Sequence, residues 1–305
     1  MKDDEIAALE GDWDKVPPAE RAAFQFTLKL TREPHTLGPD DIRALGKHYN
    51  PKQISEMVQA VAGYNSTNRW TDALNIPAEE TGEFFRRGAN VDPSVELDSF
   101  LTPTSQGFKN QVSRIAPIRA DAGVRPPLEP FDSLESHWKR ASTRQVALPL
   151  ATEPAGPAWV RLLQVFQVAN KGRISTLLAA ESKGKLDART RVMVDWTCAR
   201  QDRAWYMQEL IFRRAAALGI GAKDLKEWDH GGPGLSEKDQ AVIRLARKIT
   251  TAPWTVQDGD VAVVRKHLDD YQVAELVLHA CNAAYLDRLT EAAQLPVEKS
   301  PENSR

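Results

Sequence analysis

Apolar residues recur three and four positions apart along much of this chain, and this spacing is typical of helices with one buried face. The longest such stripes run through residues 51–74 and 271–293. Shorter helices are predicted at 19–31, 39–49, 237–250 and 258–268, and one or two more at 157–183. No segment shows the apolar–polar alternation of a strand, so the pattern predicts an all-α protein.

Capping residues support these boundaries. Ser236 stands directly before a predicted helix as its N-cap, where its side chain can accept a backbone N–H group, and Asn50 and the pair Asp269-Asp270 precede the two longest helices. Asp187 likewise precedes a segment that we interpret as one helix ending at Leu218-Gly219. That segment has an unusual feature for a core helix, because the polar run Arg200-Gln201-Asp202-Arg203 interrupts its apolar residues. We ask whether it is an active-site helix.

Two parts of the chain resemble each other when one is shifted by 219 residues. Residues 24–77 align with 243–296 without a gap, and 14 of the 54 positions carry the same residue. The identical pairs include His48 with His267, Glu56 with Glu275, and Arg69 with Arg288. The sequence therefore predicts an internal repeat of a three-helix unit, and the second copy has additional helices in front of it.

We divide the chain into four regions. Residues 1–86 form the C-terminal half of a first unit, and 157–297 form a complete second unit. Residues 87–156 form a proline-rich connector with one helix in "FDSLESHWKRAST", and 298–305 form a disordered tail.

The half unit has an apolar stripe of Ile54, Met57, Val58 and Val61, with no further helices in its own sequence to cover it. We expect it to dock onto the second unit, so that the chain associates with itself between repeats. We also expect a homo-oligomer.

Composition excludes several classes of function. Forty basic and 42 acidic residues give a net charge of −2, which offers no basic field for nucleic acid or anionic membrane. Two cysteines, Cys198 and Cys281, cannot form a disulfide framework or a four-cysteine metal site. No apolar run reaches the roughly 18 residues of a membrane span. The first residues lack the apolar core of a signal peptide. We expect a cytoplasmic protein without a metal or cofactor.

The order of helices and the segment "WTCARQDRAWYMQEL" at 196–210 resemble the carboxymuconolactone decarboxylase / AhpD-like family. The resemblance covers 157–297 as a whole unit and about 3–79 as a half unit. It implies an all-helical, commonly oligomeric protein. Members include alkylhydroperoxidases with a Cys-x-x-Cys pair, a following histidine and a preceding glutamate. A decarboxylase branch carries Trp-x-x-His in the same helix.

This sequence departs from both patterns. When Trp205 is matched to the family tryptophan, Gln208 occupies the histidine position and the two thiol positions fall near Gln201 and Ala204. The upstream glutamate falls near Arg189 or Thr190. A dithiol peroxidase needs a reactive thiolate and a neighbouring resolving thiol, and no second cysteine stands near Cys198 in the sequence.

The segment still supplies the candidate site. Cys198 is the candidate catalytic residue, and its alternative is an inert, half-buried cysteine. The candidate substrate-binding residues are Arg200, Asp202, Arg203, Trp205 and Gln208. The arginines could hold a small acidic ligand through bidentate hydrogen bonds, or they could belong to an ion-paired network that ties this helix to its neighbours.

Other polar residues have structural interpretations. His48 and His267 stand near the ends of short helices, where the helix dipole favours a cation. His279 is interpreted as a packing residue of its helix. Glu56, Glu275, Arg69 and Arg288 are expected to fix helix or subunit contacts. The resulting hypothesis is an AhpD-like small-molecule enzyme with peroxiredoxin-like hydroperoxide reduction or related chemistry. The alternative is a non-catalytic helical module for oligomerisation or ligand binding.

Overall fold

The computed structural model describes residues 13, 16–76, 126–153, 156–232 and 234–298. Within these ranges the chain forms α-helices and short 3-10 helices, and no strand. The all-α prediction is confirmed. Residues 299–305 of the predicted tail at 298–305, residues 87–125 of the predicted connector and the first twelve residues lie outside the described ranges.

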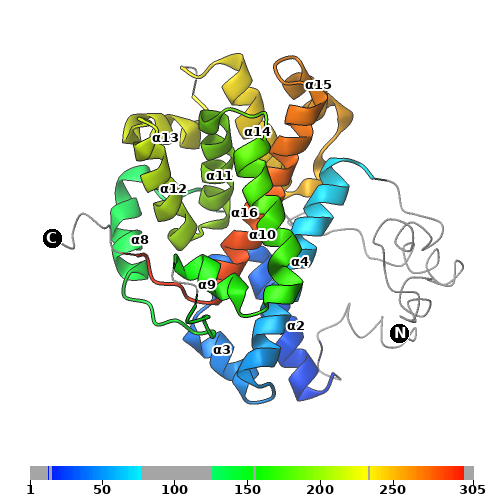
Figure 1. Ribbon diagram of the computed structural model, residues 1–305, viewed down its shortest axis with the longest axis vertical. Helices are drawn as coiled ribbons and strands as arrows, with labels where there is room; N and C mark the ends of the chain where they lie inside the picture. The colour runs from blue at the N-terminus through cyan, green and yellow to red at the C-terminus, as the bar shows by residue number, and fades with distance from the viewer. Residues whose placement is uncertain (1–12, 14–15, 77–125, 154–155, 233, 299–305) are drawn as a thin grey trace, which may run out of the picture.

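One helix, α16 (Asp270–Ala292), runs through the middle of the molecule (Figure 1). α4 (Pro51–Ala73) packs along it on one side, while α11 (Ala188–Asp202) and α12 (Trp205–Ala217) pack on another. α14 (Glu237–Thr251) also contacts α16 and α11. Because α16 is covered by several helices, almost every residue from Val273 onward is buried, polar ones included.

The elements of the two aligned stretches have the same lengths and order. The first set is α2 (Pro18–Arg32), η1 (Pro34–Thr36), α3 (Pro39–Gly46) and α4. The second set is α14, η3 (Pro253–Thr255), α15 (Asp258–Arg265) and α16. Every boundary in the second set lies 219 residues after its counterpart in the first.

The ends of the two long helices are also built alike. Asn50 and Asp269 each accept the backbone N–H three residues ahead, as their capping positions predicted. At the other end, Asn75 and Gln294 adopt positive φ angles of 48° and 51°. In both cases the backbone N–H of the next residue donates to a carbonyl of the last helical turn, and this hydrogen bond closes the helix end. Neither position carries the glycine that such a turn favours.

Two arginines join these sets of helices reciprocally. Arg69 of α4 donates to the carbonyl of Thr250 at 3.0 Å, and Arg288 of α16 donates to the carbonyl of Thr31 at 2.9 Å. Both side chains are buried. The prediction that these arginines fix helix contacts is therefore confirmed. Glu56, which was expected to behave likewise, lies exposed on α4.

The prediction of one continuous helix from Asp187 to Leu218 is wrong. Asp187 does cap α11, but α11 ends at Asp202 and α12 begins at Trp205. Arg203 lies between them in the left-handed region, with φ 52°, and the N–H of Ala204 donates to the carbonyl of Ala199 at 3.0 Å. Glycine usually occupies this position, so an arginine there gave no sequence signal for the turn.

Tertiary contacts hold Arg203 in this conformation. Its guanidinium donates to Glu129 at 2.5 Å and to the carbonyls of Pro126 and Pro127 at 2.9 and 2.7 Å. These bonds offset the roughly 1–2 kcal/mol that a left-handed conformation costs a non-glycine residue. The connector thus fixes the turn between α11 and α12.

The start of α12 is capped from another helix. Its N-cap, Ala204, has no capping side chain, but buried Glu291 of α16 accepts the backbone N–H groups of Trp205 and Tyr206. Arg144 of the connector donates to both oxygens of Glu291, at 3.2 and 2.7 Å. The negative charge lies where a helix N-terminus favours it.

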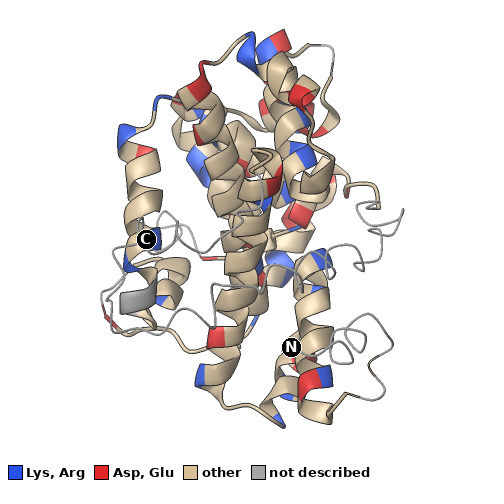
Figure 2. Cartoon of the chain, turned by 90° about the vertical axis from the view of Figure 1, so that its right-hand side faces the viewer, with Lys and Arg blue, Asp and Glu red and all other residues tan. Residues whose placement is uncertain are grey.

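The other helices surround this arrangement. The predicted connector helix is present as α8 (Leu134–Ala141), and the 157–183 segment forms α9 (Ala158–Gln164) and α10 (Gln167–Lys183). α13 (Ala222–His230), between Gly219 and Ser236, was not predicted. Acidic and basic residues are interspersed over the helices in the view of Figure 2, in keeping with the near-zero net charge. Among the described helices, none combines the length and apolarity that a membrane span requires.

Candidate functional site

Cys198 lies on α11 with its side chain fully enclosed. Its thiol is 3.1 Å from the hydroxyl of Thr250 on α14. Burial, together with the charges of Asp287, Asp195 and Asp202, raises the pKa of the thiol well above its ordinary value. These surroundings oppose formation of the thiolate that nucleophilic or redox chemistry requires. The second cysteine, Cys281, is also buried, and burial raises its pKa to about 12.

The charged run at the end of α11 lies in an ion-paired network. Arg200 pairs with Asp229 of α13 at 2.8 Å and donates to the carbonyl of Glu129 at 2.7 Å. Asp202 pairs with Arg288 of α16 at 2.8 Å, with both side chains fully buried. Arg203 pairs with Glu129, as described above. These pairs correspond to the second of the two predicted roles, an ion-paired network that ties this helix to its neighbours. A substrate-binding role for the three residues stays a prediction.

Trp205 and Gln208, the other two predicted ligand residues, pack inside the protein. The ring of Trp205 stacks on His137 of α8, with centroids 4.3 Å apart. The amide of Gln208 is fully buried and donates to the carbonyl of Ala199 at 3.1 Å. None of the six predicted site residues lines the cavity described next.

A cavity of about 540 Å³ lies on a different face of α11, between α10, α11, α12 and α16. Its size is within the range of small-molecule sites. Most of the wall is apolar, contributed by the residues Trp159, Leu177, Leu178, Ala180, Met207, Leu210, Ile211, Ala283 and Leu286. The polar lining consists of Glu181, Asp195, Arg213, Arg214, His279, Asn282 and Asp287. An apolar chamber with a few polar groups is the usual form of a ligand-binding site.

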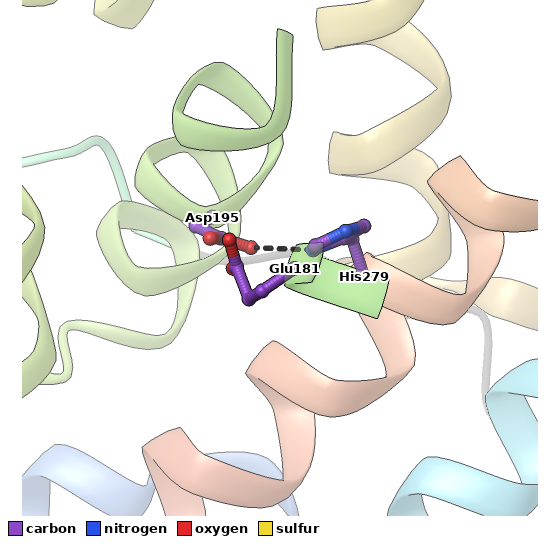
Figure 3. A group of neighbouring side chains, drawn as sticks. All are labelled: Glu181, Asp195 and His279. Atoms are coloured by element: carbon purple, nitrogen blue, oxygen red, sulfur yellow. Dashed lines mark ion pairs between the residues drawn. The ribbon is translucent and has the colours of Figure 1, made fainter. Parts of the chain in front are cut away.

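His279 and Asp195 both line this cavity, and their side chains point toward each other (Figure 3). Nδ1 of His279, on α16, lies 3.5 Å from Oδ1 of Asp195, on α11. Nε2 of His279 has no hydrogen-bond partner among the described residues, although the side chain is only 4% exposed. One ring nitrogen is therefore oriented by a carboxylate, while the other is left for a further partner.

The electrostatic surroundings favour a protonated His279. Burial alone lowers its pKa, but the hydrogen bond and charge of Asp195, with the charges of Glu181 and Glu275, raise the net pKa above the ordinary value. Glu275 lies one turn before His279 on α16, and its Oε1 is 3.9 Å from Nε2. The carboxylates around the ring therefore outweigh its desolvation.

Backbone contacts hold Glu275 in place. Its Oε2 accepts the N–H groups of Lys185 and Leu186, at 2.6 and 3.0 Å, in the loop between α10 and α11. A Cβ at Gly184 would lie 1.9 Å from Oε1 of Glu275, so only glycine fits beside this carboxylate. The expected structural role of Glu275 is confirmed, since it ties α16 to the loop that precedes α11.

Glu181, Asp195 and His279 offer ligand atoms within 4.8 Å of one another, which is compatible with a metal ion (Figure 3). However, Arg214 of α12 contacts both carboxylates, at Oε2 of Glu181 and, 3.3 Å away, at Oδ2 of Asp195. Arg191 lies 3.5 Å from the same oxygen of Glu181. Two guanidinium groups thus balance two carboxylates, which weakens the attraction for a divalent cation.

Two further polar residues of α16 line the cavity. Nδ2 of Asn282 and both carboxyl oxygens of Asp287 lack hydrogen-bond partners within the described part of the chain. Asp287 is fully buried, and burial together with the charges of Asp202, Glu291 and Asp195 raises its pKa well above the ordinary value, against the opposing charge of Arg288. These influences favour the uncharged carboxylic acid, which can donate a hydrogen bond.

Sequence reasoning treated His279 as a packing residue and assigned Asp195 no role. It did not consider Glu181, Arg214, Asn282 or Asp287. Comparison of the two aligned stretches contains a signal for two of the cavity's polar positions. Residues 219 positions before His279, Asn282 and Asp287 are Ala60, Gly63 and Asn68, so the cavity's polar groups on α16 have no like residue at the first two.

Comparisons with models of protein families, with curated proteins and with solved structures found no match to this chain. The chemistry is therefore argued from the cavity and its residues.

Proposed function

We propose that this protein is a small-molecule enzyme on an AhpD-like, internally duplicated helical scaffold, and that His279 is its acid–base group. The observation that carries the proposal is the state of the two ring nitrogens. Nδ1 lies 3.5 Å from Asp195, Nε2 has no hydrogen-bond partner among the described residues, and the His279 side chain lines a mainly apolar cavity. A histidine oriented by a carboxylate at one nitrogen is the arrangement that general acid–base catalysis uses.

The resemblance of the helix order in 157–297 and about 3–79 to the AhpD-like family supports the scaffold, as do the coinciding boundaries of the two sets of helices. The contacts of Arg69 and Arg288 support the interpretation that the two repeats associate within one chain. In this proposal the first repeat supports α16, and the second repeat supplies the cavity.

Within the cavity, each polar residue has a separate task. Asp195 is a positioning residue, since it orients the imidazole through Nδ1. Arg214 binds both Glu181 and Asp195, which fixes the two carboxylates on the same side of the ring. The neutral imidazole accepts a proton at Nε2 from a bound substrate, and the imidazolium returns a proton to the product.

The family resemblance also implies hydroperoxide reduction, and this activity has weaker support than acid–base catalysis by His279. The thiol of Cys198 is enclosed, its pKa is raised, and it lies outside the cavity lining. A non-catalytic ligand-binding module is the remaining alternative, because the same cavity could bind a molecule without changing it.

The test is deuterium incorporation from D2O into a panel of small ketones, measured by mass spectrometry. The wild-type protein should catalyse exchange at carbons next to the carbonyl of at least one ketone. His279→Gln should reduce this rate by a factor of about 10²–10⁴, while Cys198→Ser, placed outside the cavity, should leave it unchanged. Equal exchange by the wild type and His279→Gln, in proteins with the same far-UV circular dichroism, would contradict the proposal.

The pH profile gives an independent readout. The groups that face His279 are Asp195, Glu181 and Glu275 with their negative charges, and Arg214 at the first two carboxylates. Because the pKa of His279 is raised, the basic form should appear at a higher pH than for an ordinary histidine. The exchange rate should therefore increase with pH through that raised pKa. Asp195→Asn should shift the midpoint to lower pH.

A further inference from the structure

We infer that the cavity selects an uncharged, mainly apolar carbonyl compound, whose oxygen accepts a hydrogen bond from Nδ2 of Asn282. This inference deepens the proposed function, on which the reaction at His279 rests. It names the class of substrate and the residue that recognises its polar end.

The lining of the cavity favours an apolar body. Nine of its side chains are apolar, and they come from four helices, α9, α10, α12 and α16. Transfer of a matching apolar surface from water into such a chamber is favourable by about 25 cal/mol per Å². A volume of about 540 Å³ accommodates a molecule with a ring and a short side chain.

The charges around the cavity disfavour an anionic ligand. The basic lining residues already face carboxylates: Arg213 pairs with Glu209, Arg214 pairs with Glu181 and Asp195, and the ring of His279 lies against Asp195. An anion would have to displace one of these carboxylates, or be buried beside them without a counter-charge of its own. Burial of an unpaired ion is costly, whereas a neutral carbonyl compound meets no such penalty.

The polar groups of α16 favour a hydrogen-bond acceptor. Nδ2 of Asn282 can only donate, and the protonated carboxyl of Asp287 also offers a donor. Asn282 lies three residues after His279, which places the two residues roughly 4.5 Å apart along the helix axis and on one broad face. Asp287 follows about 12 Å from His279 along the axis, so it lies at the other end of the lining face.

This spacing fits proton transfer next to a carbonyl group. Nε2 of the neutral imidazole removes a proton from the adjacent carbon, and the C–H electrons form the carbon–carbon double bond of an enolate. The negative charge that develops on oxygen is stabilised by the Nδ2–H of Asn282. The imidazolium then returns its proton, or a deuteron from D2O, to the same carbon. No oxidant, reductant or further reactant takes part.

Three matched probes test the substrate class: 4-phenylbutan-2-one, 3-phenylpropanoate and butylbenzene. They share one skeleton and present a neutral carbonyl, a carboxylate and no oxygen. Their dissociation constants are measured on the full chain by saturation-transfer NMR titration at about pH 8. We expect the ketone to bind at least roughly tenfold more tightly than the carboxylate, because a buried anion loses its hydration.

Two variants test the site. Asn282→Leu keeps the side-chain size and removes the donor, so it should weaken binding of the ketone roughly fivefold to tenfold while butylbenzene binds as before or better. Asn68→Leu makes the same substitution at an exposed position of α4 and is the matched control. Ala283→Trp fills the cavity and should abolish binding of all three probes.

The inference is overturned when the carboxylate binds as tightly as the ketone, or when Ala283→Trp still binds the probes. It is also overturned when a folded Asn282→Leu protein weakens ketone and butylbenzene equally. If that variant does not fold, the probe series on the wild-type protein and on Ala283→Trp decides. Selective binding of the ketone without His279-dependent deuterium exchange would support the substrate class and reject the acid–base function. Deuterium exchange that requires His279 but is unchanged by Asn282→Leu would support the acid–base function and reject the role of Asn282 in recognising the substrate.

Discussion

Arg288 should be among the side chains on which the folded state depends most. Its guanidinium is fully buried and donates to Asp202 at 2.8 Å, to the carbonyl of Ala284 at 3.0 Å and to the carbonyl of Thr31 at 2.9 Å. One residue therefore links α16, the end of α11 and the end of α2. Arg288→Met keeps most of the apolar side chain and removes the charge together with these bonds.

The expected loss in the free energy of unfolding is about 3–5 kcal/mol, the range found when one partner of a buried ion pair is removed. Arg69 provides the matched control, since it occupies the corresponding position of α4. It donates to the backbone and side-chain oxygens of Asn65 and to the carbonyl of Thr250. The carboxylate whose charge interacts with Arg69, that of Asp72, is exposed, whereas Asp202 is fully buried. Arg69→Met should therefore cost less, about 1–3 kcal/mol.

The contribution of the buried carboxylate is isolated by a second substitution. Asp202→Asn removes the charge that Arg288→Met leaves without its guanidinium partner, so the double variant should be more stable than Arg288→Met alone by about 1 kcal/mol or more. Urea denaturation followed by tryptophan fluorescence measures all four proteins. The reasoning is refuted if Arg288→Met costs less than about 1 kcal/mol, or if Asp202→Asn destabilises the Arg288→Met protein further.

Three further predictions follow from the same contacts. Cys198→Ser should leave the rate of hydroperoxide consumption near background, as in the wild type, because the enclosed thiol has a raised pKa; a rapid wild-type rate that this variant abolishes would contradict it. The raised pKa of His279 stabilises the folded state below the unfolded pKa of about 6.5, and this stabilisation is lost as pH rises through the folded pKa; the melting temperature of His279→Gln should therefore fall further below wild type at pH 5.5 than at pH 8.5. Residues 1–86 expressed alone should aggregate, since α4 would lose its contact with α16, whereas 150–300 should fold; a cooperative monomeric melt of 1–86 would be the opposing result.

Helix positions could be predicted well because local signals set them. Asn50, Asp187, Ser236 and Asp269 all cap the helices that they precede. Apolar spacing then identifies the buried faces, and Val58 and Ile54 are indeed enclosed. These signals lie within a few residues of the feature that they specify, so a sequence displays them directly.

The turn between α11 and α12 shows why the remaining features were missed. The left-handed conformation of Arg203 is maintained by Glu129, Pro126 and Pro127, and the start of α12 is capped by Glu291. All of these partners are between 74 and 87 residues distant in the chain. The local pattern of apolar residues predicts one uninterrupted helix across such a turn, because the groups that terminate the helix come from distant parts of the chain.

The same reasoning explains why the predicted site residues and the residues that line the cavity are different sets. A run of charges on a core helix suggested a binding site, yet Arg200 and Asp202 have buried partners on α13 and α16. Single polar residues spaced along buried α16 were less conspicuous in the sequence, although Asn282 and His279 retain atoms without protein partners among the described residues. Charged residues that pair across helices stabilise the contacts between those helices, whereas buried polar residues that line a cavity and keep unpaired atoms mark a place where a ligand can supply the missing bond.

Comparison between the two aligned stretches separates these cases. Arg69 and Arg288 are identical, and both bridge the sets of helices, which is what a shared structural requirement predicts. His279 and Asn282 stand where the first stretch has Ala60 and Gly63, although the helices that carry them have the same length and the same caps. A fold that tolerates alanine and glycine at these positions of α4 does not itself require histidine and asparagine on α16. Their burial in the second stretch costs desolvation that packing alone does not repay, and a bound substrate that accepts a hydrogen bond from Asn282 and exchanges a proton with His279 accounts for both.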